Sequence, residues 1–132
     1  MYDKQVQVLA EGQERTKLIL MVEDDADIGI ILEQIIVQET FYVSLLVTSA
    51  FQALQLIHDI TPDLLLLDYQ LPGMNGIELY DRLHATKGLE EIPAIMVSAR
   101  LPRQELALRN IVGMSKPLDL DELLEAIEQL VA

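Results

Sequence analysis

Short, wholly apolar runs recur along the chain from Lys17 onward and alternate with longer amphipathic stretches. Runs of this length are typical of β-strands that are buried on both faces of a sheet. Four runs are clear and a fifth is weaker: Leu18–Val22, Tyr42–Val47, Leu64–Leu67, Ala94–Val97 and Ile111–Met114. The pattern therefore predicts five strands, separated by segments of another kind.

The segments between these runs carry apolar residues at helical spacing. Two stripes show it best: Ile28, Ile31, Leu32, Ile35 and Ile36 in the first segment, and Leu120, Leu123, Leu124, Ile127, Leu130 and Val131 in the last. A capping residue followed three positions later by Glu or Gln indicates helix starts at Ser49, Asn75 and Asp119. We expect Pro62 and Pro93 to end the helices that precede the third and fourth strands.

A strand–helix unit repeated five times predicts a doubly wound α/β domain of the flavodoxin-like kind. Crossovers between parallel strands are right-handed, and helices must cover both faces of such a sheet. We expect five parallel strands in the order 2-1-3-4-5. The domain would span residues 17–132, with residues 1–16 as a polar N-terminal tail, flexible or carrying a short extra helix.

Composition narrows the class of protein. A length of 132 residues suits one domain, and 51% apolar residues are enough for a core. With no cysteine, disulfides, thiolate metal sites and cysteine nucleophiles are excluded. A formal net charge of −13 argues against direct contact with nucleic acid or anionic membranes. Without a membrane span or signal-peptide core in the sequence, we expect a soluble, cytoplasmic domain.

The notable polar residues follow the strands. Glu23-Asp24-Asp25 end the first strand, Asp68 the third, Ser98-Ala99 the fourth and Ser115-Lys116-Pro117 the fifth. In open parallel sheets, sites form beyond the carboxyl ends of the strands. The predicted strand order makes strands one and three neighbours, so we expect Glu23, Asp24 and Asp68 to converge.

Converging carboxylates repel one another unless a cation is bound. Oxygen ligands without His or Cys favour Mg²⁺, or Mn²⁺, over zinc. Lys116 adds a positive charge suited to phosphate, and Ser98 adds a hydroxyl that can donate a hydrogen bond to the same group. Together they predict a site for phosphoryl transfer to a carboxylate, with Asp68 as the nucleophile.

These motifs resemble the receiver domains of two-component response regulators. The resemblance rests on KLILMVEDD at 17–25, LLLLDYQLPGMNG at 64–76, IMVSA at 95–99 and Lys116-Pro117, and it covers about residues 17–131. Each motif alone is modest evidence. Their joint occurrence, in order and at the ends of four strands, is highly specific.

The resemblance implies a role for each matching position. Asp68 would be the phosphoacceptor. Asp24 would be a direct Mg²⁺ ligand, with Glu23 acting largely through water and the backbone carbonyl of Gln70 completing the set. Ser98, Ala99 and Lys116 would contact the phosphoryl group. The peptide bond between Lys116 and Pro117 would be cis.

The resemblance also implies partners. A histidine kinase or histidine phosphotransfer protein of a phosphorelay would donate the phosphoryl group. It would dock on the first helix, where Ile30 faces outward, and an unknown downstream protein would receive the signal. The chain would be a signalling switch rather than a turnover enzyme, either a single-domain regulator or a receiver from a larger protein.

Two departures from the family leave alternatives open. The stretch between Ser98 and Lys116 is short, so the fourth helix must be short or atypical, starting at Pro102-Arg103 and ending at Arg109-Asn110. Gly113 occupies the position where receivers usually carry a switch aromatic residue. A pseudo-receiver that is not phosphorylated remains an alternative for this reason. A phosphatase that forms an aspartyl-phosphate is a weaker one, because such enzymes typically have a second acid where this chain has Gln70.

Overall fold

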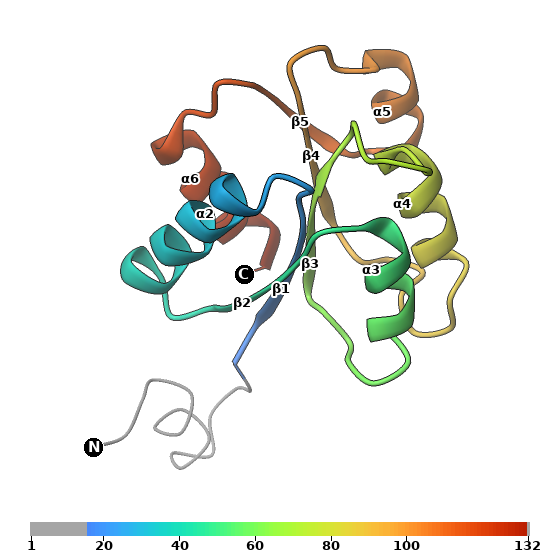
Figure 1. Ribbon diagram of the computed structural model, residues 1–132, viewed down its shortest axis with the longest axis horizontal. Coiled ribbons are helices and arrows are strands. Elements are labelled where there is room, and N and C mark those ends of the chain that lie inside the picture. The colour runs from blue at the N-terminus through green and yellow to red at the C-terminus, as the bar shows by residue number, and fades with distance from the viewer. Residues whose placement is uncertain (1–15, 132) are drawn as a thin grey trace.

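The computed structural model describes residues 16–131. Within them lies a five-stranded parallel sheet (Figure 1). The strand order is β2-β1-β3-β4-β5, which confirms the predicted topology. Each strand begins and ends within a few residues of its predicted position: β1 Leu18–Val22, β2 Val43–Val47, β3 Leu64–Asp68, β4 Ala94–Ser98 and β5 Val112–Ser115. The expected tail falls almost wholly outside the described residues.

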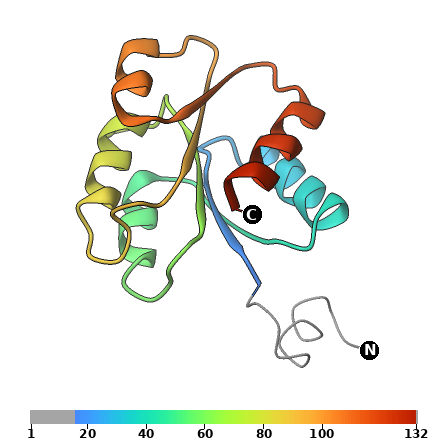
Figure 2. The same cartoon turned by 180° about the vertical axis from the view of Figure 1, so that it is seen from behind.

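Among the described residues, five helices cover the two faces of the sheet (Figures 1 and 2). One face is covered by α2 and α6, and the other by α3, α4 and α5. Their bounds are α2 Ala26–Glu39, α3 Ala50–Leu56, α4 Gly76–His84, α5 Arg103–Arg109 and α6 Leu120–Val131. Within residues 16–131, none of these helices has the length and apolar character that crossing a membrane requires.

The three central strands separate two hydrophobic cores. Successive side chains of a strand point to opposite faces. In β1, Ile19 and Met21 therefore join the core beneath α2 and α6, while Leu20 and Val22 join the core on the other side. The outer strands differ from the prediction, because β2 is half-buried along its length and β5 is partly exposed. Burial on both faces thus holds only for β1, β3 and β4.

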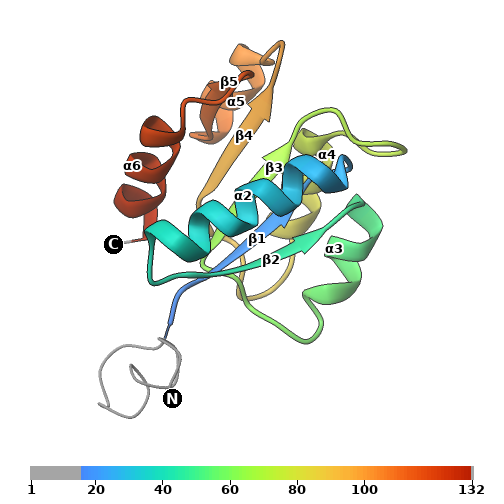
Figure 3. The ribbon, with the colours of Figure 1, turned by 60° about the vertical axis from the view of Figure 1, so that its left-hand side comes forward.

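The apolar stripe predicted for the first helix, α2, is only partly buried. The residues buried against the sheet are Gly29, Leu32 and Ile36, whereas Ile28 and Ile31 are 39% and 55% exposed. Gly29 explains the difference, since a Cβ at this position would lie 2.7 Å from Cδ1 of Leu46 in β2. The helix turns its smallest residue toward the strand so that it can approach closely. Figure 3 shows α2 lying against β1 and β2.

The predicted helix starts are correct. The side chain of Ser49 accepts a hydrogen bond from the backbone N–H of Gln52, and that of Asp119 accepts one from Glu122. Asn75 and Glu78 form a reciprocal capping box. These bonds satisfy backbone donors that the first helical turn leaves unpaired.

The predicted role of the prolines is wrong. Helices α3 and α4 end at Leu56 and His84, several residues before Pro62 and Pro93. The prolines instead lie in the loops that lead into the strands, and the carbonyl of Pro93 already accepts a bond from the N–H of Leu65 in β3. The fourth predicted helix, α5, is short as expected, and Asn110, with a positive φ of 57°, caps its C-terminal end.

Candidate functional site

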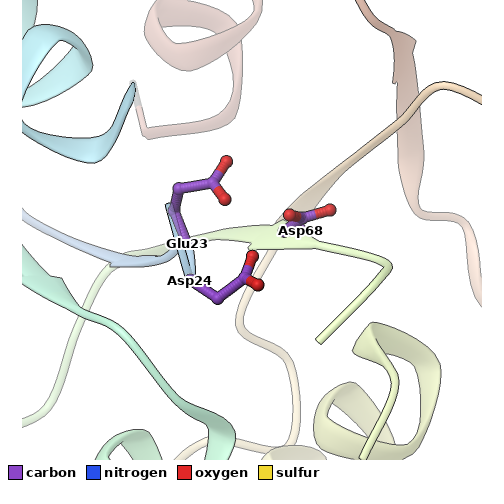
Figure 4. A group of neighbouring side chains, drawn as sticks. All are labelled: Glu23, Asp24 and Asp68. Carbon is purple, nitrogen blue, oxygen red and sulfur yellow. The ribbon is translucent and has the colours of Figure 1, made fainter. Parts of the chain in front are cut away.

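The carboxyl ends of β1 and β3 bring three acids together. The two strands are neighbours, with Val22 beside Leu67, so Glu23 and Asp24 emerge next to Asp68. Each of the three offers a carboxylate oxygen within 4.8 Å of the others (Figure 4). The expected convergence is therefore present in the structure.

Backbone hydrogen bonds hold two of these acids in place. Asp68 and Glu23 are 6% and 5% exposed, whereas Asp24 is exposed. The N–H of Gln70 donates to Oδ1 of Asp68, and the N–H of Asp25 donates to Oε2 of Glu23, both at 3.1 Å. Each buried carboxylate thus keeps its second oxygen for another partner.

Lys116, just beyond β5, supplies that partner. Its Nζ lies 3.4 Å from Oδ2 of Asp68 and 3.5 Å from Oε1 of Glu23. Its backbone N–H donates to the carbonyl of Ser98 at 3.0 Å, which ties the end of β5 to the end of β4. The Lys116–Pro117 peptide is cis, as the resemblance implied.

One lysine does not balance this negative charge. Burial raises the pKa of Glu23 from 4.5 to about 7, and the carboxylate of Asp68 adds to the effect, although the N–H of Asp25 and the charge of Lys116 oppose it. Burial alone would lower the pKa of Lys116, but the two carboxylates outweigh it and the pKa is raised. The site favours any additional positive charge.

A hard divalent cation fits the residues that are present. The three side chains offer only carboxylate oxygens, and two of these side chains are buried without a full counter-charge. Such donors suit Mg²⁺ or Mn²⁺ and do not suit zinc or copper. This cluster can therefore hold a metal ion.

Ser98 is 1% exposed at the end of β4, on the strand next to Asp68. Its hydroxyl donates to the carbonyl of Arg100 at 3.0 Å and accepts from the N–H of Arg100 at 3.1 Å. Ala99, the next residue, is exposed, and so is Gln70, which lies two residues after Asp68. The serine therefore lies at the site, with its hydrogen bonds directed to its own loop.

A family model for the response regulator receiver domain matches residues 19–128. The chain belongs to this family. Receiver domains act in two-component signalling, and their structures include the parallel sheet found here.

Curated relatives show the same membership. The chain is 31% identical to sporulation initiation phosphotransferase F of Bacillus subtilis over 84% of its own length and 90% of the relative. It is 36% identical to the DNA-binding response regulator MtrA of Mycolicibacterium paratuberculosis, over 68% of the chain. The match covers only 38% of the length of MtrA, so most of MtrA lies outside the aligned region.

Solved structures agree on the fold. A CheY-like receiver domain protein from Methanospirillum hungatei has a TM-score of 0.76 at 29% identity, covering 86% of this chain and 92% of that one. A receiver domain of an HD domain-containing protein from Pseudomonas fluorescens has a TM-score of 0.78 at 28% identity, covering 89% and 88%. Both solved structures are receiver domains with this architecture.

Three contacts in this half of the domain were not foreseen from the sequence. They are the bonds between Ser98 and the backbone of Arg100, the packing of two leucines over Gly113, and the ion pair between Arg109 and Asp81. The sequence gives no local signal for these three contacts. It does for a fourth, the ion pair between Glu105 and Arg109, because the two residues lie four positions apart in one helix.

Proposed function

We propose that this receiver domain accepts a phosphoryl group on Asp68 from a histidine kinase or a histidine phosphotransfer protein. The observation that carries the proposal is the position of Asp68. Its buried carboxylate ends β3, beside the acids of β1 and within 3.4 Å of the Lys116 amine. A single carboxylate between an acidic pair and a fixed cation is suited to attack on phosphorus.

In the transfer, Oδ2 of Asp68 attacks the phosphorus of the phosphohistidine. A P–O bond to the aspartate forms while the P–N bond to the donor imidazole breaks, and the electron pair of that bond stays on the imidazole. Lys116 then exchanges its contact with Oδ2 for one with a phosphoryl oxygen. Hydrolysis of the acyl phosphate returns the carboxylate and inorganic phosphate.

Glu23, Asp24, Asp68 and the backbone carbonyl of Gln70 would hold Mg²⁺, with Mn²⁺ as a substitute. When bound, the ion supplies neutralising charge as the phosphoryl group arrives. Glu23 and Asp24 would hold the ion beside Asp68, and the N–H of Gln70 keeps Oδ1 of Asp68 in position at 3.1 Å.

Ser98 would donate a hydrogen bond to the transferred phosphoryl group, with Ala99 providing a small residue at the rim. The hydroxyl lies at the end of the strand that pairs with β3, so a rotation about its side-chain bond changes its partner without moving the strand. We infer that Ser98 and Lys116 together report whether Asp68 is phosphorylated.

We place the domain in the cytoplasm as a switch for protein interactions, not as a turnover enzyme. The donor would dock on α2, where Ile30 is 47% exposed and Ile31 is 55% exposed. A phosphorylated surface would then bind a downstream protein. The charge of −13 argues against direct nucleic-acid binding by this domain.

Intact-protein mass spectrometry tests the proposal. The chain is incubated with acetyl phosphate, with and without Mg²⁺, beside Asp68→Asn and the exposed control Asp59→Asn. We expect one phosphoryl adduct on the wild type and on Asp59→Asn, dependent on Mg²⁺, and none on Asp68→Asn. An adduct that persists in Asp68→Asn would overturn the assignment of the phosphoacceptor.

A pseudo-receiver is the second candidate, favoured by Gly113 and by the short α5. If neither an adduct nor binding of beryllofluoride with Mg²⁺ is detected, the domain is a docking module of receiver shape.

A further inference from the structure

The hydroxyl of Ser98 fastens the loop between β4 and α5. It donates to the carbonyl of Arg100 and accepts from its N–H, and it is 1% exposed. A serine hydroxyl has a single proton to donate. If Ser98 donates to a phosphoryl group on Asp68, it must give up its bond to the Arg100 carbonyl.

The residue after Arg100 packs over the centre of β5. A Cβ placed on Gly113 would lie 3.2 Å from Cδ1 of Leu101 and 2.8 Å from Cδ1 of Leu106. The space above Gly113 is thus filled by two leucine side chains, one from the loop and one from α5. An aromatic side chain at position 113 would have no room in this arrangement.

The two leucines differ in how firmly they are held. Helix α5 is fastened near its C-terminal end, because Arg109 donates to both carboxylate oxygens of Asp81 in α4, at 2.7 and 2.9 Å. The hydroxyl of Tyr80 adds a bond to the carbonyl of Arg109. At the other end, Pro102 caps α5 without a side-chain hydrogen bond. Leu106 therefore belongs to the fastened part. Leu101 is partly buried against the same core, but it lies on the loop that the Ser98 hydroxyl fastens through Arg100.

Leu101 also borders a hollow in the surface. The hollow has a volume of about 380 Å³ and lies between the start of α5, the end of β5 and the start of α6, with Leu101, Gly113, Met114 and Asp119 among its lining residues. A movement of Leu101 changes the shape of this hollow directly.

We propose that Leu101 is the positioning residue that carries the state of the Asp68 site to the surface of β5. The Ser98 hydroxyl holds Leu101 over Gly113 until it turns to the phosphoryl group, and Leu101 then leaves Gly113 and reshapes the hollow. This inference rests on the proposed phosphorylation of Asp68. It assigns the signal to an aliphatic side chain in the loop, with Leu106 as a fixed neighbour.

Methyl NMR on the full chain tests the proposal. We measure the nuclear Overhauser effects (NOEs) from the δ-methyls of Leu101 and Leu106 to the α-protons of Gly113, before and after addition of beryllofluoride with Mg²⁺. We expect the Leu101 effect to fall several-fold and the Leu106 effect to stay. In Ser98→Ala, the Leu101 effect should already be weak without any phosphoryl mimic.

Substitutions of Leu101 distinguish a signalling role of this side chain from a purely structural one. Leu101→Ala should still form the acetyl phosphate adduct but lose the phosphorylation-dependent shifts of the Gly113 and Met114 amides, and Leu101→Met should restore them. The control Leu108→Ala, at a position 79% exposed on α5, should behave as wild type.

The outcomes distinguish the two claims. Absence of any adduct and of beryllofluoride binding removes the proposed function and, with it, the trigger for Leu101. An adduct with an unchanged Leu101–Gly113 contact, or amide shifts that survive in Leu101→Ala, overturns the role of Leu101 alone.

Discussion

Replacing Glu23 with Gln removes one of the two buried carboxylates at the strand ends while keeping the size of the side chain. In the metal-free protein, burial and the neighbouring Asp68 raise the pKa of Glu23 from 4.5 to about 7. A carboxyl group whose pKa is raised by folding favours the folded state below its unfolded pKa. That contribution is lost as the pH rises through the folded pKa.

The magnitude follows from the two pKa values. Moving a carboxyl pKa from 4.5 to about 7 corresponds to about 3 kcal/mol of unfolding free energy, since each tenfold change in proton affinity is worth about 1.4 kcal/mol. We therefore expect metal-free Glu23→Gln to be more stable than wild type by up to about 3 kcal/mol near pH 8. The difference should shrink toward zero as the pH falls to about 4.5.

Urea unfolding in the presence of a chelator, from about pH 4 to pH 8, measures this difference. Glu125→Gln, on the exposed side of α6, makes the same charge change away from the site and should show no such pH-dependent gain. Adding Mg²⁺ near pH 8 should raise the melting temperature of the wild type and have much less effect on Glu23→Gln. A difference between wild type and Glu23→Gln that is constant across the pH range would refute the reasoning.

Three further substitutions test the packing around the site by urea unfolding. Gly76→Ala should lower the free energy of unfolding by about 3 kcal/mol. Its Cβ would lie 2.5 Å from Sδ of Met96 and 2.7 Å from the backbone carbonyl oxygen of Asp68. The control Gly88→Ala has open space around it, so only its φ of 93° disfavours a side chain there. That should lower the free energy of unfolding by about 1 kcal/mol, and equal losses in the two variants would contradict this account. Asn75→Ala removes the cap of α4 and should cost about 1 kcal/mol; an unchanged midpoint would show that the cap is not needed. Arg109→Ala removes the ion pair that joins α5 to α4 and should lower the free energy of unfolding by about 1 kcal/mol or less. Faster amide exchange in α5 is the sharper readout.

Much of the fold follows from patterns that lie within short stretches of the chain. The apolar run at 64–67 needs burial on both faces, and only the middle of a parallel sheet provides that. Ser49, Asn75 and Asp119 act within one helical turn, so their capping role is visible in the sequence. The convergence of Glu23, Asp24 and Asp68 also follows from the sequence, because parallel strands that run side by side end at the same edge of the sheet.

Other features depend on which side chains meet across elements, and only the tertiary structure decided them. The buried face of α2 was set by the close approach of Gly29 to Leu46, which a helical stripe alone does not reveal. Arg109 pairs with Asp81, which lies 28 residues earlier in the chain. A periodic pattern states that a side chain is buried, but it does not state against what.

The clearest example is Gly113. From the sequence, it marked only the loss of a switch aromatic residue. The structure shows Leu101 and Leu106 filling the space above it, and the hydroxyl of Ser98 holding the loop that carries Leu101. The sequence by itself determined the strands, the helix caps and the acids at the strand ends, because these depend on local spacing and on parallel topology. The route that we propose for the signal rests on packing between a loop, a helix and a strand, and such contacts exist only in the folded chain.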